Sequence, residues 1–466
     1  MQENNDLLAQ NKMGHVPVGK LLLQMSVPMA ISMLVQALYN IIDSMFVAQI
    51  SENALTAVSL AFPVQNFIIS MGVGTAVGVN AILSKSLGEK NQKLVNASAE
   101  NGLSLMGIYA IFFAILGLLF SRIFFTLQTD NQAIIDYGTQ YTMVVTIWSV
   151  GCFIQVIGER LLVSTGKTHY AMITQITGAV INVVLDPILI FGIGPFPRME
   201  VVGAAVATVF AQTVAGLLAL YLGHKKNTEI QLDLKKVFRP SGLVIKRILA
   251  VGVPSICMMS IGSIMVLLLN VILNTFTSTA VAVFGVYFKL QGFAIMPCIG
   301  INNGMVPIIA YNYGARNKTR VMQTIKFAVL YSYVVLVVAI AIFQIFPSPI
   351  LKIFNATPEM MAIGVPALRI ISLCWFFAGL CIVFGSVFQA LGSGVSSLIV
   401  SFGRQLVVLV PAAFLLSLTG SVTNVWWSFP IAECMSLLLS IIFMKRIYRL
   451  KIHPLELPIV DDSSRE

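Results

Sequence analysis

Long apolar stretches, separated by short polar ones, follow one another along almost the whole chain. A helix needs about 20 mostly apolar residues to cross the hydrocarbon layer of a bilayer. Twelve stretches reach that length, at approximately residues 20–48, 54–84, 94–127, 132–163, 168–192, 200–223, 246–276, 280–311, 321–347, 361–389, 394–418 and 422–447. The pattern predicts an all-α integral membrane protein with twelve transmembrane helices.

The longest polar stretch between these helices divides them into two sets of six. It covers residues 224–245, which we predict to be a cytoplasmic linker between an N lobe (20–223) and a C lobe (246–448). Polar tails are predicted at 1–19 and 449–466. The first tail has no short apolar region followed by a small-residue cleavage site, so we expect no removable signal peptide.

The two predicted lobes are related by an internal repeat. A shift of 226 residues places Pro28 on Pro254, and ten of 38 positions are then identical between 54–91 and 280–317. The matched positions include the pairs Gly74/Gly300, Gly78/Gly304, Gly88/Gly314 and, further along, Gly166/Gly392. Because six helices preserve orientation, the repeats are parallel, which is typical of transporters that bind between or within their halves.

Composition agrees with a bilayer environment. The chain is 57% hydrophobic and only 10% charged, whereas soluble domains carry about 25% charged residues. The net charge of +10 comes from basic residues placed between apolar runs rather than on one amphipathic face, so we expect no nucleic-acid partner. The six cysteines all lie in apolar runs and have neither metal-ligand nor disulfide-framework spacing.

Loop charges predict the orientation. One set of loops and the C-terminal tail are rich in Lys and Arg, whereas the opposite loops hold only Arg122, Arg198 and Lys352. The rich set comprises Lys85, Lys90, Lys93, Arg160, Lys167, Lys225, Lys226, Lys235, Lys236, Arg239, Lys246, Arg247, Arg316, Lys318, Arg320, Lys445, Arg446, Arg449 and Lys451. Basic loops stay in the cytoplasm. We therefore predict a multi-pass protein of the plasma (inner) membrane with both termini in the cytoplasm.

Two acidic residues stand inside predicted helices. An ionised Asp at a helix centre costs about 2.5–3.5 kcal/mol on insertion scales, so such residues are functional candidates. Asp43 and Asp186 both lie in the outer half of their helices, and Tyr39 and Asn182 precede them by four residues, on the same helix faces. If the two faces meet, they form a pocket with two carboxylates, a phenol and an amide.

Such a pocket suits ion coupling. Two neighbouring carboxylates resist double ionisation, so the pair can hold one proton. The same oxygens suit Na⁺ equally well, and the sequence does not choose between the ions. The alternative is that each Asp is a helix-end carboxylate in interfacial water. Pro187, beside Asp186, and Pro28, in the first helix, are predicted to kink their helices and to assist gating.

The acidic pocket belongs to the N lobe alone. At the repeat offset, its four residues fall on Met265, Leu269, Val408 and Ala412. The C lobe has intramembrane charges of its own, namely Lys289, Arg369, Arg404 and Glu433. Lys289 or Arg404 paired with Glu433 could line the substrate path or form a structural ion pair. Gln65 and Gln291, matched across the lobes, could be cavity wall or interhelical hydrogen bonds, and we favour the latter.

Several motifs together resemble the multidrug and toxic compound extrusion (MATE) family, over nearly the whole length. They are P-x14-D and Y-x3-D in the first helix (Pro28, Tyr39, Asp43), N-x3-D-P in the fifth (Asn182, Asp186, Pro187), GAAVAT in the sixth (Gly203 to Thr208), and YFKLQ and VPIIAYNYGARN in the eighth helix and the loop after it. Within the family, the chain is most similar to the DinF-like or MepA-like branch.

The resemblance implies two lobes around a central cavity and rocking alternating access. It also implies export of cationic amphiphiles such as dyes and fluoroquinolones, driven by influx of H⁺ or Na⁺. In the DinF-like branch the N-lobe Asp pair with its Tyr and Asn forms the cation site, together with a Thr of the sixth helix, for which Thr208 is the candidate. The NorM-like branch has acids in the C lobe, but the seventh helix here has none, which favours protons.

Other functions fit less well. A lipid-linked oligosaccharide flippase of the same superfamily needs a basic cavity for pyrophosphate, which Lys289 and Arg404 permit but the N-lobe acids oppose. A membrane enzyme or receptor would need a nucleophile and base cluster, a metal motif or a sizeable soluble domain. Gly72, Gly74 and Gly78 resemble a nucleotide loop only by letter, and no strand precedes them. We expect no enzymatic activity and no cofactor, and no metal apart from a possible Na⁺ at Asp43 and Asp186. We expect the protein to be a monomer.

Overall fold

The computed structural model describes residues 11–354 and 356–456, and every regular element within them is helical. The first half contains α2 (Lys12–His15), α3 (Val18–Ala48), α4 (Glu52–Gly88), α5 (Gln92–Thr126), α6 (Gln132–Ile147), α7 (Val150–Ser164), α8 (Thr168–Phe191), α9 (Glu200–Lys226) and α10 (Leu234–Val237). The second half contains α11 (Gly242–Asn274), α12 (Ser278–Gly314), α13 (Lys318–Ile345), α14 (Pro347–Ile353), α15 (Pro358–Leu373), α16 (Trp375–Ala390), α17 (Gly394–Phe402), η1 (Gly403–Leu409), α18 (Val410–Ser417), α19 (Val422–Val425), α20 (Ser428–Ile447), η2 (Tyr448–Ile452) and η3 (His453–Glu456).

The number of membrane-spanning segments agrees with the prediction of twelve. In the described part of the chain, ten helices are long and apolar enough to cross a bilayer, and two bent pairs each amount to one more. The pairs are α6 with α7, bent by 46°, and α15 with α16, bent by 47°. We predicted a single helix over 132–163 and over 361–389, and both are broken instead.

The internal repeat is visible in the helix boundaries. The bounds of α4 and α12 coincide after a shift of 226 residues, and the breaks at Trp148 and Cys374 are separated by the same number. The turn residues Lys90 and Arg316 also match, with left-handed φ angles of 56° and 54°. The two halves therefore fold alike, down to backbone conformations that L-residues rarely adopt.

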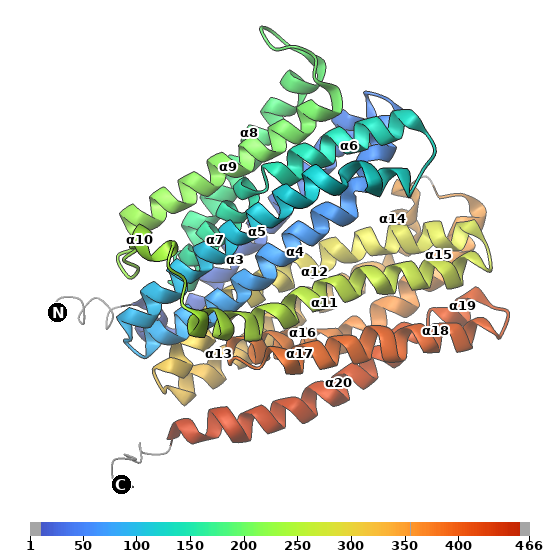
Figure 1. Ribbon diagram of the computed structural model, residues 1–466. Helices are drawn as coiled ribbons and strands as arrows, with labels where there is room; N and C mark the ends of the chain where they lie inside the picture. Colours follow the sequence, from blue (N-terminus) through green and yellow to red (C-terminus); the bar gives the residue numbers. More distant parts are fainter. Residues whose placement is uncertain (1–10, 355, 457–466) are drawn as a thin grey trace, which may run out of the picture.

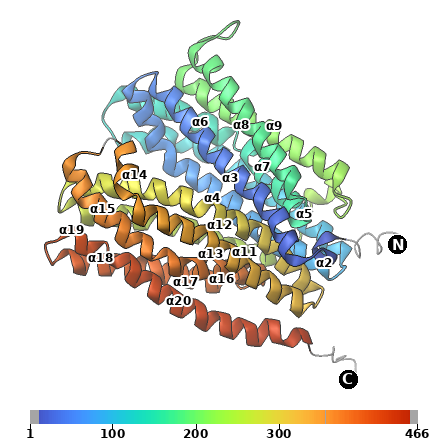
Figure 2. The ribbon, with the colours of Figure 1, turned by 180° about the vertical axis from the view of Figure 1, so that it is seen from behind.

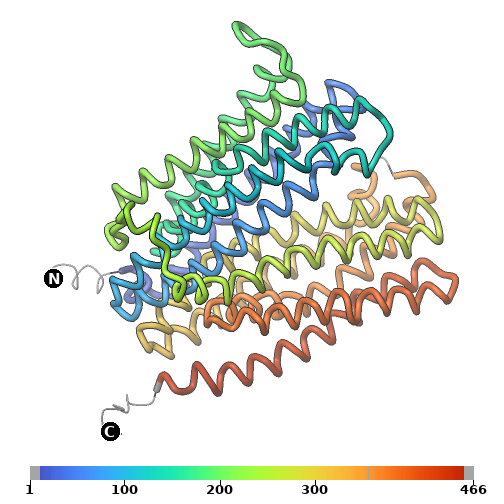
Figure 3. Tube along the Cα trace, in the orientation of Figure 1, coloured from blue at the N-terminus to red at the C-terminus, as the bar shows by residue number. Residues whose placement is uncertain are grey.

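The halves form two bundles that lie side by side. Figures 1 and 2 show α3 to α9 on one side of the molecule and α11 to α20 on the other, and the colours of Figure 3 separate in the same way. Helices α3 and α4 of the N lobe pack against α11 and α12 of the C lobe. The lobe interface is therefore made mainly by the first two long helices of each half.

The glycines of α4 and α12 that the repeat matches lie in this interface. A Cβ on Gly74 would lie 2.5 Å from the side chain of Ile256 in α11, and one on Gly300 would lie 2.7 Å from Ala30 in α3. Gly74 therefore serves helix packing, not the nucleotide loop that its spacing from Gly72 and Gly78 resembles only by letter. Small residues let helix backbones approach closely where no larger side chain fits.

Helix α2 fastens both lobes together at one end of the molecule, called here the α2 end. Asn11 donates its amide hydrogens to the Thr165 carbonyl of the N lobe at 3.1 Å and to Oε1 of Glu229, in the segment after α9, at 3.0 Å. Arg320 of the C lobe donates to the carbonyl oxygens of Met13 at 3.0 Å and Val16 at 2.7 Å. Figure 2 shows that the C-terminal end of α20 lies on the same side of the molecule as α2.

Some predicted boundaries shift. Helix α9 continues to Lys226 and α11 begins at Gly242, so the segment between them is shorter than 224–245 and contains α10. After α20 the chain stays helical to Glu456 rather than leaving the bundle at 449, and residues 457–466 lie outside the described part. Arg160, predicted in a cytoplasmic loop, lies inside α7.

Candidate functional site

A cavity of about 470 Å³ opens in the N lobe, toward the end opposite α2. Its walls come from α3, α4, α6, α7 and α9. Its polar lining side chains are Tyr39, Asn40, Asp43, Ser44, Ser59, Gln65, Tyr141, Thr208 and Gln212. Its volume lies in the range of about 300–1,000 Å³ that is typical of small-molecule sites.

The structure brings together the two acidic residues singled out in the sequence. Asp43 of α3 lines the cavity, and Asp186 of α8, which is fully buried, lies within side-chain hydrogen-bonding reach of it. Two carboxylates this close together resist double ionisation, so the pair can hold one proton. Asp43 Oδ1 and Asp186 Oδ2 are buried and have no hydrogen-bond partner among the described residues.

Asn182 links the acidic pair to the sixth transmembrane helix. Its Nδ2 donates to Asp186 Oδ1 at 3.3 Å, one helical turn along α8, and to Thr208 Oγ1 of α9 at 3.3 Å. The side-chain oxygen of Asn182 is buried without a partner in the described part of the protein. The predicted candidates Asn182, Asp186 and Thr208 therefore form one hydrogen-bonded group, and Asp43 and Tyr39 extend it to the cavity.

Gln65 combines the two roles that the sequence left open. It lines the cavity, and its Nε2 donates to the hydroxyl of Tyr141 in α6 at 2.6 Å. Tyr141 was not among the sequence candidates, although a tyrosine inside an apolar stretch is a signal that could have found it. Gln212, one turn beyond Thr208 on α9, was missed as well.

The two predicted kinks fall inside unbroken helices. Pro28 lies within α3 and Pro187 within α8, and the structure breaks neither helix there. Because Pro28 has no N–H, the carbonyl of Gln24 loses its helical donor. The hydroxyl of Thr168 in α8 approaches this carbonyl at 3.5 Å. The gating role of both prolines stays a prediction.

The four C-lobe charges separate into one ion pair and two exposed cations, Lys289 and Arg369. Arg404 Nη1 lies 2.6 Å from Glu433 Oε1, between η1 and α20. Both residues and Gln291 line a small cavity of about 70 Å³ with several aromatic side chains. Lys289 is exposed and has no carboxylate partner among the described residues. Of the two proposed partners of Glu433, the structure therefore has Arg404.

A second polar cluster in the N lobe was missed by the sequence analysis. Gln155 donates from Nε2 to Glu159 Oε1 at 3.0 Å and to Gln175 Oε1 at 2.9 Å, which connects α7 to α8. The neighbouring Arg160 donates to Asn303 Oδ1 of α12 at 3.3 Å, across the lobe interface. The signal was Gln155 and Glu159 one turn apart, but we assigned the adjacent arginine to a loop.

Sodium remains compatible with the oxygens of the acidic pair, because hard cations take carboxylate, amide and hydroxyl oxygens. Across residues 11–354 and 356–456, no three His, Cys, Asp or Glu side chains are grouped to hold a metal ion. An ion bound here would therefore take ligands from Asp43 and Asp186 together with neutral groups such as Asn182 and Thr208.

Known proteins resemble the chain along nearly all of it. Multidrug export protein MepA of Staphylococcus haemolyticus (strain JCSC1435) is 26% identical over 430 residues, which are 92% of this chain and 94% of that protein. The FAD transporter of Shewanella oneidensis is 27% identical over 423 residues, covering 90% and 92%. MepA of Staphylococcus aureus (strain MRSA252) is 28% identical over 435 residues, covering 92% and 94%.

Solved structures agree with these relatives. An outward-facing conformation of a multidrug resistance MATE family transporter of the MOP superfamily superimposes with a TM-score of 0.87 at 25% identity, covering 96% of this chain and 98% of that one. A MATE in complex with MaL6 gives 0.86 at 26% identity, covering 95% and 98%. The MatE family model matches residues 28–188 and 254–415, together more than half of the chain and again offset by the repeat. The chain therefore belongs to the MatE family of multi-pass membrane transporters.

Proposed function

We propose that this protein is a secondary antiporter that exports cationic, amphiphilic molecules in exchange for protons. The observation that carries the proposal is the close approach of Asp43 and Asp186 at the edge of an N-lobe cavity. Such a pair can hold one proton that a cation displaces, because the two negative charges otherwise repel one another away from water. The relatives named multidrug export proteins support the substrate class.

Exchange at this pair gives a direction to transport. Protonation from outside neutralises one carboxylate and weakens the attraction for a bound cation, which leaves. Loss of the proton to the cytoplasm restores the charge and lets the next cation bind. In this scheme Asn182 holds Asp186 in place, and Thr208 fixes Asn182 in turn.

Alternating access requires that the lobes separate at one end at a time. The lobe interface is tightly packed at the α2 end, and the cavity lies toward the other end. The likeness to an outward-facing transporter supports an outward-facing state for this arrangement. The basic loops support a cytoplasmic position for the α2 end, because Lys and Arg remain on that side. We therefore propose that both termini are cytoplasmic, and that the protein works as a monomer in the plasma membrane.

Export of an anionic dinucleotide is the second candidate function. It is favoured by the relative named FAD transporter and by the exposed cation Lys289. The acidic pair disfavours it, since two carboxylates repel a pyrophosphate. The same repulsion disfavours a lipid-linked oligosaccharide flippase, which we rank below both of these candidate functions.

Transport into everted membrane vesicles tests the proposal. Ethidium, norfloxacin and FAD are each offered while a proton gradient or a Na⁺ gradient is imposed separately. Uptake of ethidium and norfloxacin driven by the proton gradient is the expected result. Uptake driven only by the Na⁺ gradient would show that Na⁺, not H⁺, is the coupling ion. Uptake of FAD alone would show that the substrate is an anionic dinucleotide and not a cationic amphiphile.

A further inference from the structure

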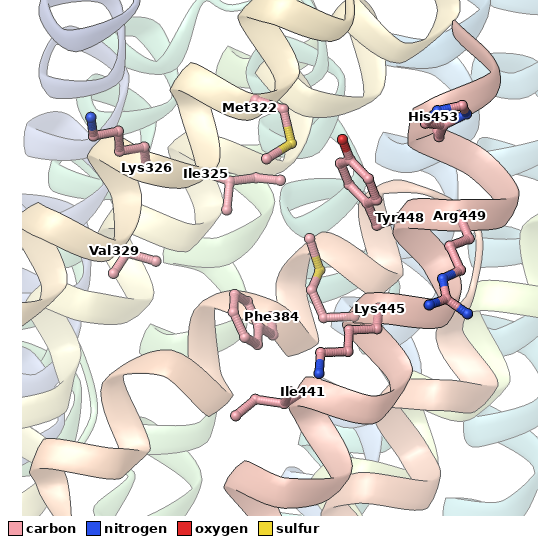
Figure 4. A pocket seen from close by; sticks show the side chains of 11 residues that line it. Met322, Ile325, Lys326, Val329, Phe384, Ile441, Lys445, Tyr448, Arg449 and His453 are labelled. Carbon is pink, nitrogen blue, oxygen red and sulfur yellow. The ribbon is translucent and has the colours of Figure 1, made fainter.

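A second, larger cavity lies on the outside of the C lobe, near the α2 end. Its volume is about 800 Å³, it is open on one side, and it is bordered by α13, α16, α20 and the helical extension η2 and η3. Figure 4 shows Met322, Ile325, Phe384 and Tyr448 directed into the space between these elements. The apolar part of its wall consists of Met322, Ile325, Val329, Phe384, Ile441 and Met444. The candidate transport site does not use this cavity, which shares no lining residue with it.

Basic side chains surround the cavity without acidic ones. Lys326, Lys445, Arg449 and His453 belong to its lining, and all four are exposed. None of the lining residues is an aspartate or glutamate, and no described carboxylate forms an ion pair with the four basic residues. An apolar wall with an uncompensated basic rim therefore fits a molecule with an apolar body and an anionic head.

The basic rim lies at the depth of lipid headgroups. Lys445 stands two residues before the end of α20, and Arg449 follows in η2. Lys326 stands eight residues into α13, about 12 Å along the helix, and a lysine stem can carry its charge toward the membrane surface. The cytoplasmic leaflet, in which the α2 end lies by the distribution of basic loops, contains the anionic lipids of the membrane.

We propose that this cavity binds one anionic phospholipid. The phosphodiester lies at Lys445 and Arg449, and an acyl chain lies along Ile325, Val329 and Phe384. Charge complementarity selects this occupant: a cationic substrate would meet only like charges at the rim, and a soluble phosphate would leave the apolar wall unfilled. The bound lipid connects α20 to α13 at the end where the lobes meet. This site is independent of the antiport proposed above.

Native mass spectrometry of the purified full-length protein tests the proposal. The detergent-solubilised protein is mixed with phosphatidylglycerol and phosphatidylcholine of identical chains in equal amounts, and with glycerol 3-phosphate in a separate arm. The wild type should retain one phosphatidylglycerol in preference to phosphatidylcholine and should not retain glycerol 3-phosphate. Equal retention of the two lipids, or retention of glycerol 3-phosphate, would overturn the proposal.

Variants separate the head from the chain. The double variant Lys445→Gln/Arg449→Gln should weaken phosphatidylglycerol retention by roughly tenfold or more, because each basic residue contributes to attraction for anionic lipid. The matched control is Lys225→Gln/Lys235→Gln, two exposed cytoplasmic lysines away from the cavity, which should bind like wild type. Val329→Trp should obstruct the path of the acyl chain and weaken phosphatidylglycerol retention, and retention at the wild-type level in that variant would contradict the assignment.

Discussion

Gly88 of α4 and Gly314 of α12 lie where these two helices cross, and each glycine makes the equivalent contact with the other lobe. A Cβ on Gly88 would lie 1.9 Å from the carbonyl oxygen of Tyr311, and one on Gly314 would lie 2.1 Å from the carbonyl oxygen of Lys85. Tyr311 and Lys85 are themselves separated by the repeat interval of 226 residues. The α2 end is therefore closed by a pseudo-symmetric contact of backbone on backbone.

Replacing Gly88 by leucine should prevent this closure. A side chain meets backbone rather than a flexible neighbour there, so α4 and α12 must move apart. We expect the rate of gradient-driven ethidium uptake to fall by about tenfold or more, because the transport cycle requires the state in which the α2 end is closed. Hydrogen–deuterium exchange over residues 82–92 and 308–317 should rise. Gly107→Leu is the matched control, since a Cβ at that position has no neighbour within 4 Å. Unchanged exchange in Gly88→Leu would show that the crossing is not a gate.

Thr208→Val should weaken the acidic site without removing it. The substitution keeps the side-chain shape but deletes the hydroxyl that accepts from Asn182 Nδ2. A lost hydrogen bond of about 1 kcal/mol corresponds to a roughly fivefold lower rate of gradient-driven ethidium uptake. Thr208→Ser keeps an acceptor and should transport within about twofold of wild type. If both variants behaved alike, the hydroxyl would have no part in holding Asn182.

Arg404→Gln tests whether the C-lobe ion pair is structural. The Glu433 side chain is 9% exposed and would lose its charged partner. We expect a loss of stability on the order of 2 kcal/mol, less than for a fully buried pair because Arg404 is 30% exposed. The thermal midpoint of the purified protein measures this. The double variant Arg404→Met/Glu433→Met should recover both stability and transport. Recovered stability without transport would assign the pair to the substrate path.

The twelve spans and the repeat could be predicted from the sequence alone, because the length of apolar stretches and the spacing of matched glycines can be read without knowing which helices touch. It could not predict the breaks at Trp148 and Cys374, since neither position has the proline that usually signals a kink. Pro28 and Pro187, which the sequence analysis expected to kink their helices, lie in helices that are not broken there. Bends of this kind depend on packing against neighbouring helices rather than on local sequence.

For the site, spacing on one helix was informative and contacts between helices were not. The four-residue interval correctly predicted that Asn182 lies beside Asp186. The rarity of an acidic residue inside an apolar helix identified Asp43 as the neighbour of Asp186. Tyr141 and Gln212 line one cavity, and Glu159 belongs to a separate cluster with Gln175, but the sequence could not orient their helices toward one another. These groupings arise only when α6 packs near α9 and α7 packs against α8.

The most direct test of the account is gradient-driven ethidium uptake by everted vesicles that contain Asp43→Asn or Asp186→Asn protein at wild-type abundance. Asparagine keeps the size of the side chain but cannot hold the shared proton as a carboxyl pair does. The matched control is Asp130→Asn, an exposed acid with no ion pair among the described residues. The account predicts that both site variants lose uptake by about tenfold or more, while the control keeps it. Wild-type uptake in Asp186→Asn vesicles would contradict coupling at this pair.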